Sequence, residues 1–158
     1  MFLLPFLNPY HFFPLTNFST EWLALALGLA ALVPLSVKRF WDEIALPGFE
    51  KMAAAIKPGN PLEAIREAGK FFRQNGVQSR PIHAHGIDLI TDGPHVFCEH
   101  VHAEPFEQVF KPGMVFMAEP NPISADGRFG IFLGHTFIVT ETGNECVDKF
   151  PWELVAAG

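Results

Sequence analysis

Cysteine and basic residues are scarce in this chain of 158 residues. The two cysteines, Cys98 and Cys146, stand far apart and form no CxxC pair, which excludes a disulfide framework and a zinc ribbon. Eleven Lys and Arg against 17 Asp and Glu give a net charge of −6, so a nucleic-acid partner is not expected. Composition therefore indicates one domain of a reducing compartment, and we expect a cytoplasmic location.

Residues 1–40 lack Asp altogether, and no Lys or Arg precedes Lys38. We treat them as an apolar leader and assign residues 41–158 to a separate domain. Within the leader, residues 22–37 carry no charge, but they fall short of the roughly 20 residues of a membrane helix and include Pro34. Three interpretations stay open: a buried or misassigned segment, a membrane contact that anchors a cytoplasmic domain, and a signal peptide that lacks its basic start.

Helical periodicity begins at Trp41 and predicts a first helix that runs to the Lys57-Pro58-Gly59 stop. Asn60 is the predicted cap of a second helix ending near Gln74, with Gly76 at its C-terminal cap. Short apolar runs between turn residues then predict strands at 87–90, 114–119, 130–133, 136–140 and 145–147, with a loop at 95–110. This order predicts an α+β fold in which two helices precede a mostly antiparallel sheet.

Four segments in fixed order carry a family resemblance: residues 52–59 (MAAAIKPG), 85–87 (HGI), 111–120 (KPGMVFMAEP) and 136–143 (TFIVTETG). Together they resemble the pita-bread metallopeptidases, which include methionine aminopeptidase, Xaa-Pro aminopeptidase, prolidase and creatinase. Residues 149–154 (KFPWEL) also resemble the usual ending of Xaa-Pro peptidases. The match covers roughly residues 41–155 and corresponds to the second half of the family's catalytic domain. The resemblance thus implies a partial pita-bread domain.

The resemblance also implies a set of site residues. Members of the family hold two divalent metals (Mn, Co or Zn) with two Asp, one His and two Glu. The His corresponds to His85 and the first Glu to Glu119, whereas the second Glu falls on Gly134 and the Asp pair finds no match upstream. His135 could replace the missing Glu as a nitrogen ligand, and a substrate-contacting His falls on Asp92. With two of five ligands left, we expect no tightly bound metal.

Other histidines allow two interpretations each. His83 lies two residues from His85, so on a strand it would share that face and line the same substrate cleft; otherwise it is a hydrogen-bonded sheet histidine. Cys98, His100 and His102 would share one face if extended, with His95 nearby, as a soft zinc or copper site requires. The simpler interpretation of that stretch is a polar surface loop.

Three functional hypotheses follow. The first is a truncated or degenerate Xaa-Pro peptidase-like protein, inactive alone. The second is a scaffold module that binds a peptide or protein in the remnant cleft. The third is a metal-free hydrolase like creatinase, with His85 as acid and base. Peptides are the partners that the resemblance implies, and a solitary half-domain would expose apolar surface that a homodimer could cover.

Overall fold

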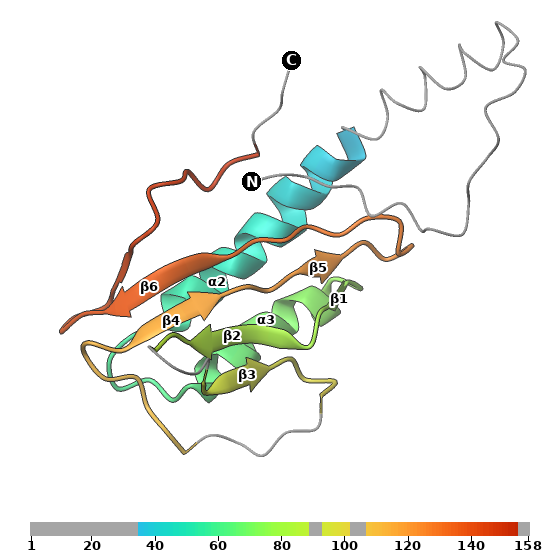
Figure 1. Ribbon diagram of the computed structural model, residues 1–158. Helices are drawn as coiled ribbons and strands as arrows, with labels where there is room; N and C mark the ends of the chain where they lie inside the picture. Colours follow the sequence, from blue (N-terminus) through green and yellow to red (C-terminus); the bar gives the residue numbers. More distant parts are fainter. Residues whose placement is uncertain (1–34, 89–92, 102–106, 155–158) are drawn as a thin grey trace, which may run out of the picture.

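The computed structural model describes residues 35–88, 93–101 and 107–154 (Figure 1). Most of the predicted leader therefore lies outside the described residues, as do Asp92 and His102. Within the described ranges, no helix combines the length and apolar character needed to cross a membrane. The segment 22–34 is not covered by that finding.

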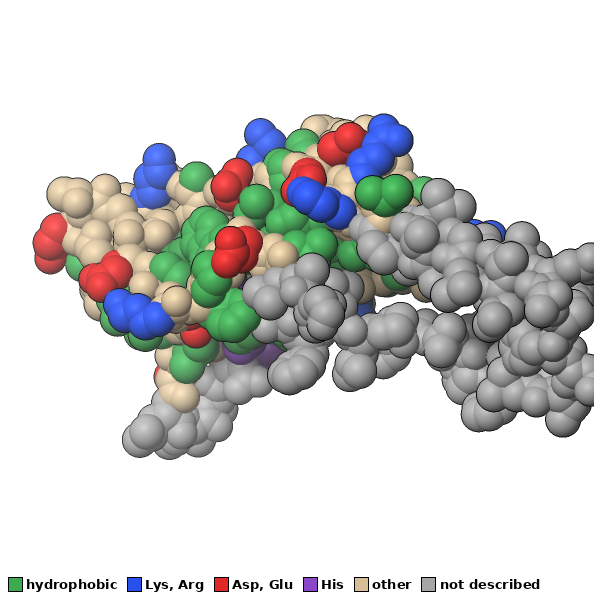
Figure 2. Space-filling model, turned by 90° about the horizontal axis from the view of Figure 1, so that it is seen from above, with side chains coloured by type: hydrophobic (Ala, Val, Ile, Leu, Met, Phe, Trp, Pro, Cys, Tyr) green, Lys and Arg blue, Asp and Glu red, His purple; other side chains and the backbone are tan. Residues whose placement is uncertain are grey.

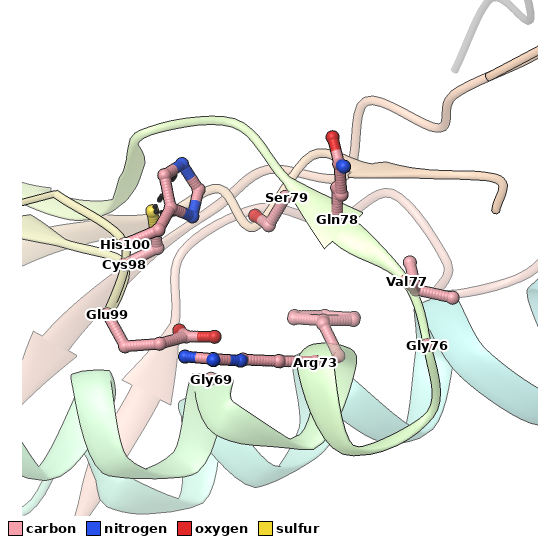
Figure 3. Close-up of a pocket in the computed structure, with 10 residues that line it drawn as sticks. Gly69, Arg73, Gly76, Val77, Gln78, Ser79, Cys98, Glu99 and His100 are labelled. Carbon is pink, nitrogen blue, oxygen red and sulfur yellow. Dashed lines mark hydrogen bonds between the residues drawn. The ribbon is translucent and has the colours of Figure 1, made fainter.

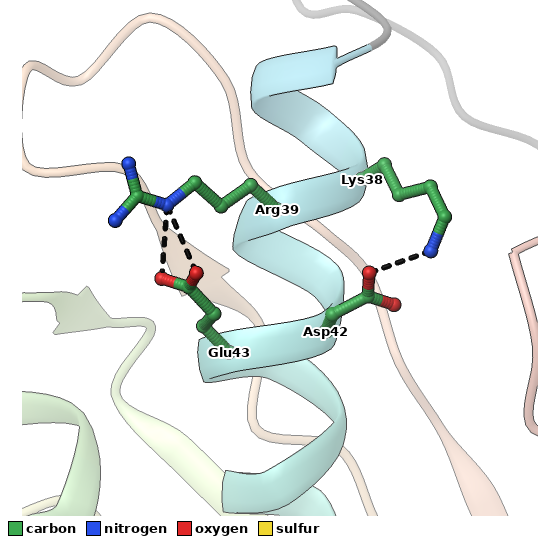
Figure 4. A network of polar contacts seen from close by, with 4 residues as sticks. All are labelled: Lys38, Arg39, Asp42 and Glu43. Atoms are coloured by element: carbon green, nitrogen blue, oxygen red, sulfur yellow. Dashed lines mark hydrogen bonds and ion pairs between the residues drawn. The ribbon is translucent and has the colours of Figure 1, made fainter.

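The first helical segment crosses the boundary that the sequence predicts at residue 40. Residues 35–40 are α-helical, Trp41–Ala45 form a π-helical turn (η1), and Leu46–Ala55 continue as α2. Two exposed ion pairs, Lys38–Asp42 and Arg39–Glu43, lie along its first turns (Figure 4). Each places the base N-terminal to the acid, the weaker orientation on a helix, so these pairs add little stability. Burial of the apolar face holds this helix in place.

The second helix, α3 (Glu63–Gln74), lacks the cap that its sequence predicts. Leu62 occupies the N-cap position, and no side chain caps the helix. The Asn60 side-chain amide instead donates to the carbonyl oxygen of Ala55 at 2.9 Å, which satisfies a backbone group at the end of α2. At the other end the prediction is confirmed, because Gly76 follows the helix with a φ of 71°.

Seven strands in the described part of the chain form two antiparallel sheets (Figure 1). The larger sheet has the order β3-β2-β4-β6-β7, with β2 at Ile82–Gly86, β3 at His95–Phe97, β4 at Val115–Ala118, β6 at His135–Val139 and β7 at Asn144–Cys146. The smaller sheet pairs β1 (Gln78–Ser79) with β5 (Pro122–Ile123). The predicted α+β class, with two helices before an antiparallel sheet, is confirmed.

Strand boundaries depart from the prediction in three places. The first strand of the large sheet ends at Gly86, so residues 87 and 88, predicted as strand, lie beyond it. β3 falls inside the predicted 95–110 loop, and residues 130–133 make only one isolated bridge, between Gly130 and Ile123. The histidines inside β2 and β3 hide these strands from a search for apolar runs, whereas the backbone pairing of β2 with β3 and β4 holds both strands in the sheet.

The core lies between the two helices and one face of the large sheet (Figure 1). Helices and strands both contribute almost fully buried side chains to this core. They are Phe49, Met52, Ile56, Ile65 and Phe72 from the helices and Ala84, Val96, Phe116, Ala118, Phe137 and Val139 from the strands. The Asn144 side chain in β7 donates to the carbonyl oxygens of both Ala53 and Ile56 at 2.8 Å, which ties the edge strand to the end of α2. Figure 2 shows further hydrophobic side chains gathered at the surface, with charged side chains around them.

His83 does not share the face of His85, so the predicted cleft role is wrong. The β2–β3 pairing shifts register between Ile82 and Ala84, and this bulge turns the His83 side chain toward the helices. The ring is fully buried beside Phe72, and its Nε2 lies 3.1 Å from the Ser79 hydroxyl oxygen. It is the hydrogen-bonded sheet histidine of the alternative interpretation.

The Gly69→Ala variant tests the packing of α3 on the sheet. A Cβ on Gly69 would lie 2.2 Å from the His83 ring, so helix and strand must separate. Alanine normally gains helix propensity, yet here we expect a loss of about 1–3 kcal/mol in the free energy of unfolding. Urea denaturation measures it, with Gly143→Ala as the control because nothing lies within 4 Å of its Cβ. Equal stability of the two variants would contradict this packing.

Burial, with smaller contributions from the charges of His100 and Arg66, lowers the pKa of His83 to about 4. The unfolded chain takes up this proton near pH 6.5 and the folded chain only near pH 4, so acid favours unfolding. We expect this histidine to remove roughly 3 kcal/mol of stability as the pH falls through that window. Urea titrations across the window should show a shallower pH dependence in His83→Leu than in His95→Gln. The same pH dependence of stability in both variants would show that the pKa of His83 is not lowered in the folded chain.

Candidate metal centre

The pairing of β2 with β4 brings His85 and Glu119 together. His85 lies opposite Met117 in the antiparallel register, and Glu119 follows the end of β4, where its backbone N–H donates to the His83 carbonyl oxygen at 2.8 Å. His85 Nε2 lies 3.7 Å from Glu119 Oε1, and the two side chains are 17% and 16% exposed. This distance exceeds a hydrogen bond and is close to the roughly 3.3 Å between two ligand atoms on one tetrahedral ion.

The local backbone orients the His85 ring. Its Nδ1 lies 3.1 Å from the Gly86 carbonyl oxygen, so with the proton on Nδ1 the lone pair of Nε2 points toward Glu119. Gly86 itself admits no side chain, because a Cβ there would lie 2.3 Å from the Gly93 carbonyl oxygen. The His-Gly pair in the sequence is therefore a requirement of this close backbone approach. The His95 ring lies 5.8 Å from that of His85, on the next strand.

On the third side of the pair, at position 134, the described part of the chain supplies no ligand. A Cβ on Gly134 would lie 3.7 Å from the Glu119 Cβ, which places this residue beside the pair. It would also lie 2.6 Å from the terminal methyl of Met117 and 3.2 Å from the Phe132 ring. Where a carboxylate would complete the donor set, the chain has a glycine covered by a thioether and an aromatic ring. One imidazole and one carboxylate do not fit a dinuclear centre.

His135 cannot stand in for the missing ligand, so that expectation is wrong. It pairs with Ala118, whose side chain faces the core, and successive residues of a strand point to opposite faces. The ring is 6% exposed and packs between Phe49 and Trp152, at centroid distances of 5.5 and 5.6 Å. Burial lowers the pKa of His135, and the nearby Asp148 carboxylate opposes that shift. The side chain thus points away from His85.

The cysteine–histidine stretch lines a different hollow. A cavity of about 510 Å³ lies between α3 and the ends of β1 and β3, with Cys98 and His100 at one side and Arg73 on the helical side (Figure 3). The Cys98 sulfur lies 3.1 and 3.3 Å from the two His100 ring nitrogens. Burial raises the pKa of the Cys98 thiol. His95 lies on the other strand face beside His85, and no third ligand among the described residues completes a metal set here.

Sequence reasoning missed one cluster. Ligand atoms of His135, Cys146 and Asp148 lie within 4.8 Å of one another, which no other His, Cys, Asp or Glu trio in the described ranges achieves. The residues come from β6, β7 and the segment after β7. The sequence does contain a signal for this cluster, namely turn residues at 140–143. A tight turn there pairs the strands on either side and brings position 135 next to positions 146 and 148.

The fold and the His–Glu pair define a partial metallopeptidase domain of the pita-bread class. A family model for metallopeptidase family M24 matches residues 38–141. This chain belongs to that family, which confirms the resemblance found in the sequence.

The chain resembles a curated relative in sequence and two solved structures in fold. The chain is 33% identical over 109 residues to the probable dipeptidase PepE of Mycobacterium tuberculosis, which covers 64% of this chain and 26% of the relative. It is similar to the structure of dipeptidase PepE from Mycobacterium ulcerans (TM-score 0.63, 23% identity, 75% of this chain and 31% of that one). The X-Pro aminopeptidase of Thermotoga maritima gives a TM-score of 0.61 at 22% identity, with 75% and 32% coverage. The chain thus spans about a quarter of the length of the curated relative and about a third of each solved chain.

Restoring a carboxylate at position 134 tests the geometry of the His85–Glu119 pair. The double variant Gly134→Glu with Met117→Ala removes the methyl contact and adds a third ligand, so we expect Mn²⁺ affinity to rise by roughly tenfold or more. Isothermal titration calorimetry measures it. The matched control, Gly134→Gln with Met117→Ala, has the same shape without the charge. Equal Mn²⁺ binding by both variants would show that position 134 does not face the pair.

Proposed function

We propose that this chain is an Xaa-Pro peptidase-like domain of family M24 whose metal site is a remnant and which does not hydrolyse peptides alone. One observation carries the proposal: Gly134, Met117 and Phe132 form an apolar wall where the site needs an oxygen ligand. The similar proteins described above, two dipeptidases and an X-Pro aminopeptidase, support peptides as the substrate class.

Peptide hydrolysis in a metallopeptidase depends on a divalent ion that lowers the pKa of a bound water and polarises the carbonyl. Two donors 3.7 Å apart supply too few ligands to hold two such ions. The chain offers no Asp before Asp42, and that residue pairs with Lys38 on the exposed side of the first helix. What His85 and Glu119 can still do is bind: a carboxylate and an imidazole accept hydrogen bonds from the N–H groups of a peptide.

A peptide- or protein-binding module is the second candidate, favoured by the apolar side chains around the pair. Ile138 lies on the same sheet face as Met117 and is 38% exposed, and Phe132 is 59% exposed. Exposed apolar side chains beside a few polar groups are typical of surfaces that bind partners. Such a module would bind the same class of ligand as its catalytic relatives without cleaving it.

The test is an assay of the purified chain with Xaa-Pro dipeptides and added Mn²⁺, Co²⁺ or Zn²⁺. We expect no release of proline above the buffer rate, and no change in His85→Ala or Glu119→Gln, because the metal set is incomplete. A full-length M24 dipeptidase assayed in parallel shows that the conditions support hydrolysis.

Hydrolysis that His85→Ala abolishes would overturn the proposal, since it would show that the pair still works in catalysis. Fluorescence anisotropy with a labelled Xaa-Pro peptide addresses the second candidate in the same samples. Binding without cleavage, weakened in Glu119→Gln, would support a binding module. Absence of any binding would leave the inactive domain as the better description.

A further inference from the structure

The geometry points to a zinc site that is separate from the His85–Glu119 pair, formed by His135, Cys146 and Asp148 on the core-facing side of the β6–β7 hairpin. The candidate ligand atoms, an imidazole nitrogen, a thiol sulfur and a carboxylate oxygen, lie within 4.8 Å of one another. The inference does not rest on the proposed function, because the two sites use different residues on opposite faces of the sheet.

The hairpin register places these three residues together. Phe137 pairs with Cys146, and beyond β7 the Val147 N–H still donates to the Thr136 carbonyl oxygen at 2.9 Å. Continuing this antiparallel register puts Asp148 opposite His135. Residues two apart on an extended strand share a face, so Cys146 and Asp148 both lie on the side of His135. The cluster thus follows from the backbone pairing.

His135 supplies an independent reason to expect a ligand. Its side chain is only 6% exposed, held between the rings of Phe49 and Trp152, and its Nδ1 is buried without a hydrogen-bond partner among the described residues. The nearest carboxylate oxygen, Asp148 Oδ2, lies 3.6 Å away, beyond hydrogen-bond distance. Buried ring nitrogens are normally paired, so an unpaired one next to a carboxylate, in a cluster that includes a thiol, indicates a missing partner.

The donor chemistry selects the metal. Imidazole with thiolate suits zinc and disfavours the hard ions Mg²⁺, Ca²⁺ and Mn²⁺. Ligand bonds of about 2.0–2.3 Å in a tetrahedral shell put neighbouring ligand atoms roughly 3.3–3.7 Å apart, and the His135–Asp148 distance of 3.6 Å falls in this range. The Cys146 thiol contacts the Asp148 carbonyl oxygen at 3.7 Å, and a side-chain rotation would move its sulfur from this contact to the metal. On binding, the thiol releases its proton to solvent and the sulfur joins the metal as thiolate.

Surrounding groups complete the site. The backbone N–H of Thr136 donates to Asp148 Oδ2 at 2.5 Å, which fixes the carboxylate as outer contacts fix metal ligands elsewhere. Three protein ligands leave a fourth tetrahedral position. A hollow of about 200 Å³ bordered by Gly134, His135, Asp148 and Phe150 adjoins them, so water or a small anion can reach that position.

The experiment uses the full chain, freed of metal, with Zn²⁺ as the probe in calorimetry and Co²⁺ as the probe in absorption spectroscopy. We expect one equivalent of Zn²⁺, and for Co²⁺ an absorption band from charge transfer out of thiolate. Cys146→Ser and Asp148→Asn should each weaken Zn²⁺ binding at least 10–100-fold, and Cys146→Ser should abolish the band. Asp148 is exposed and Cys146 is half-buried, so we expect both variants to fold, which circular dichroism checks.

Two control variants separate this site from the others. Cys98→Ala removes the second thiol, and the double variant His85→Ala with Glu119→Gln removes the peptidase remnant. We expect both to keep one equivalent of Zn²⁺ and the Co²⁺ band. Zn²⁺ binding that survives Cys146→Ser and Asp148→Asn, that disappears with His85 and Glu119, or that is lost on simple desalting would overturn the inference. None of these readouts depends on peptide hydrolysis, so failure here is distinguishable from failure of the proposed function.

Discussion

The pairing of β2 with β4 is the constraint on which the rest of the structure depends. Ala84 opposite Ala118 directs one side of the sheet toward α2 and α3, and two small side chains at this contact let the helices approach closely. The same pairing sends His85 and Glu119 to the other side. A slip of one residue would exchange the faces, burying the histidine and exposing the core, so the core and the site are determined by one register.

Sequence reasoning succeeded where a single local rule governs a residue. Helical spacing from Trp41 predicted the first helix, and the ordered motifs assigned His85 and Glu119 to one site, where the structure brings them within 3.7 Å. It failed where a tertiary contact overrides the local rule. Asn60 donates a hydrogen bond to the end of α2 instead of capping α3. A β-bulge, which no sequence pattern predicts, turns the His83 side chain toward the helices. His135 is a different failure: it adjoins Gly134 on an extended strand, so the two could never face one site, and strand alternation alone would have shown this.

The two faces of the segment 134–136 have different surroundings, and the face of Gly134 is apolar. Gly134 faces Met117 and Glu119, and its missing side chain is replaced by methyl and ring atoms that pack well. No charge is left buried without a partner at that position, so the apolar wall costs the fold little. A carboxylate there would be stable only with a cation beside it.

On the opposite face of the sheet, a polar atom is buried without a hydrogen-bond partner among the described residues. The His135 ring is needed as a packing surface between Phe49 and Trp152, yet its buried Nδ1 has no hydrogen-bond partner among the described residues. A purely apolar side chain of similar size would fill that space without this cost, so packing alone does not account for a histidine. A ligand held jointly by His135, Cys146 and Asp148 would also link β6 to the segment after β7, which carries Trp152 onto Phe49. Because a ligand that binds only the folded chain stabilises it, a metal at this hairpin would tie the C-terminal segment to the core.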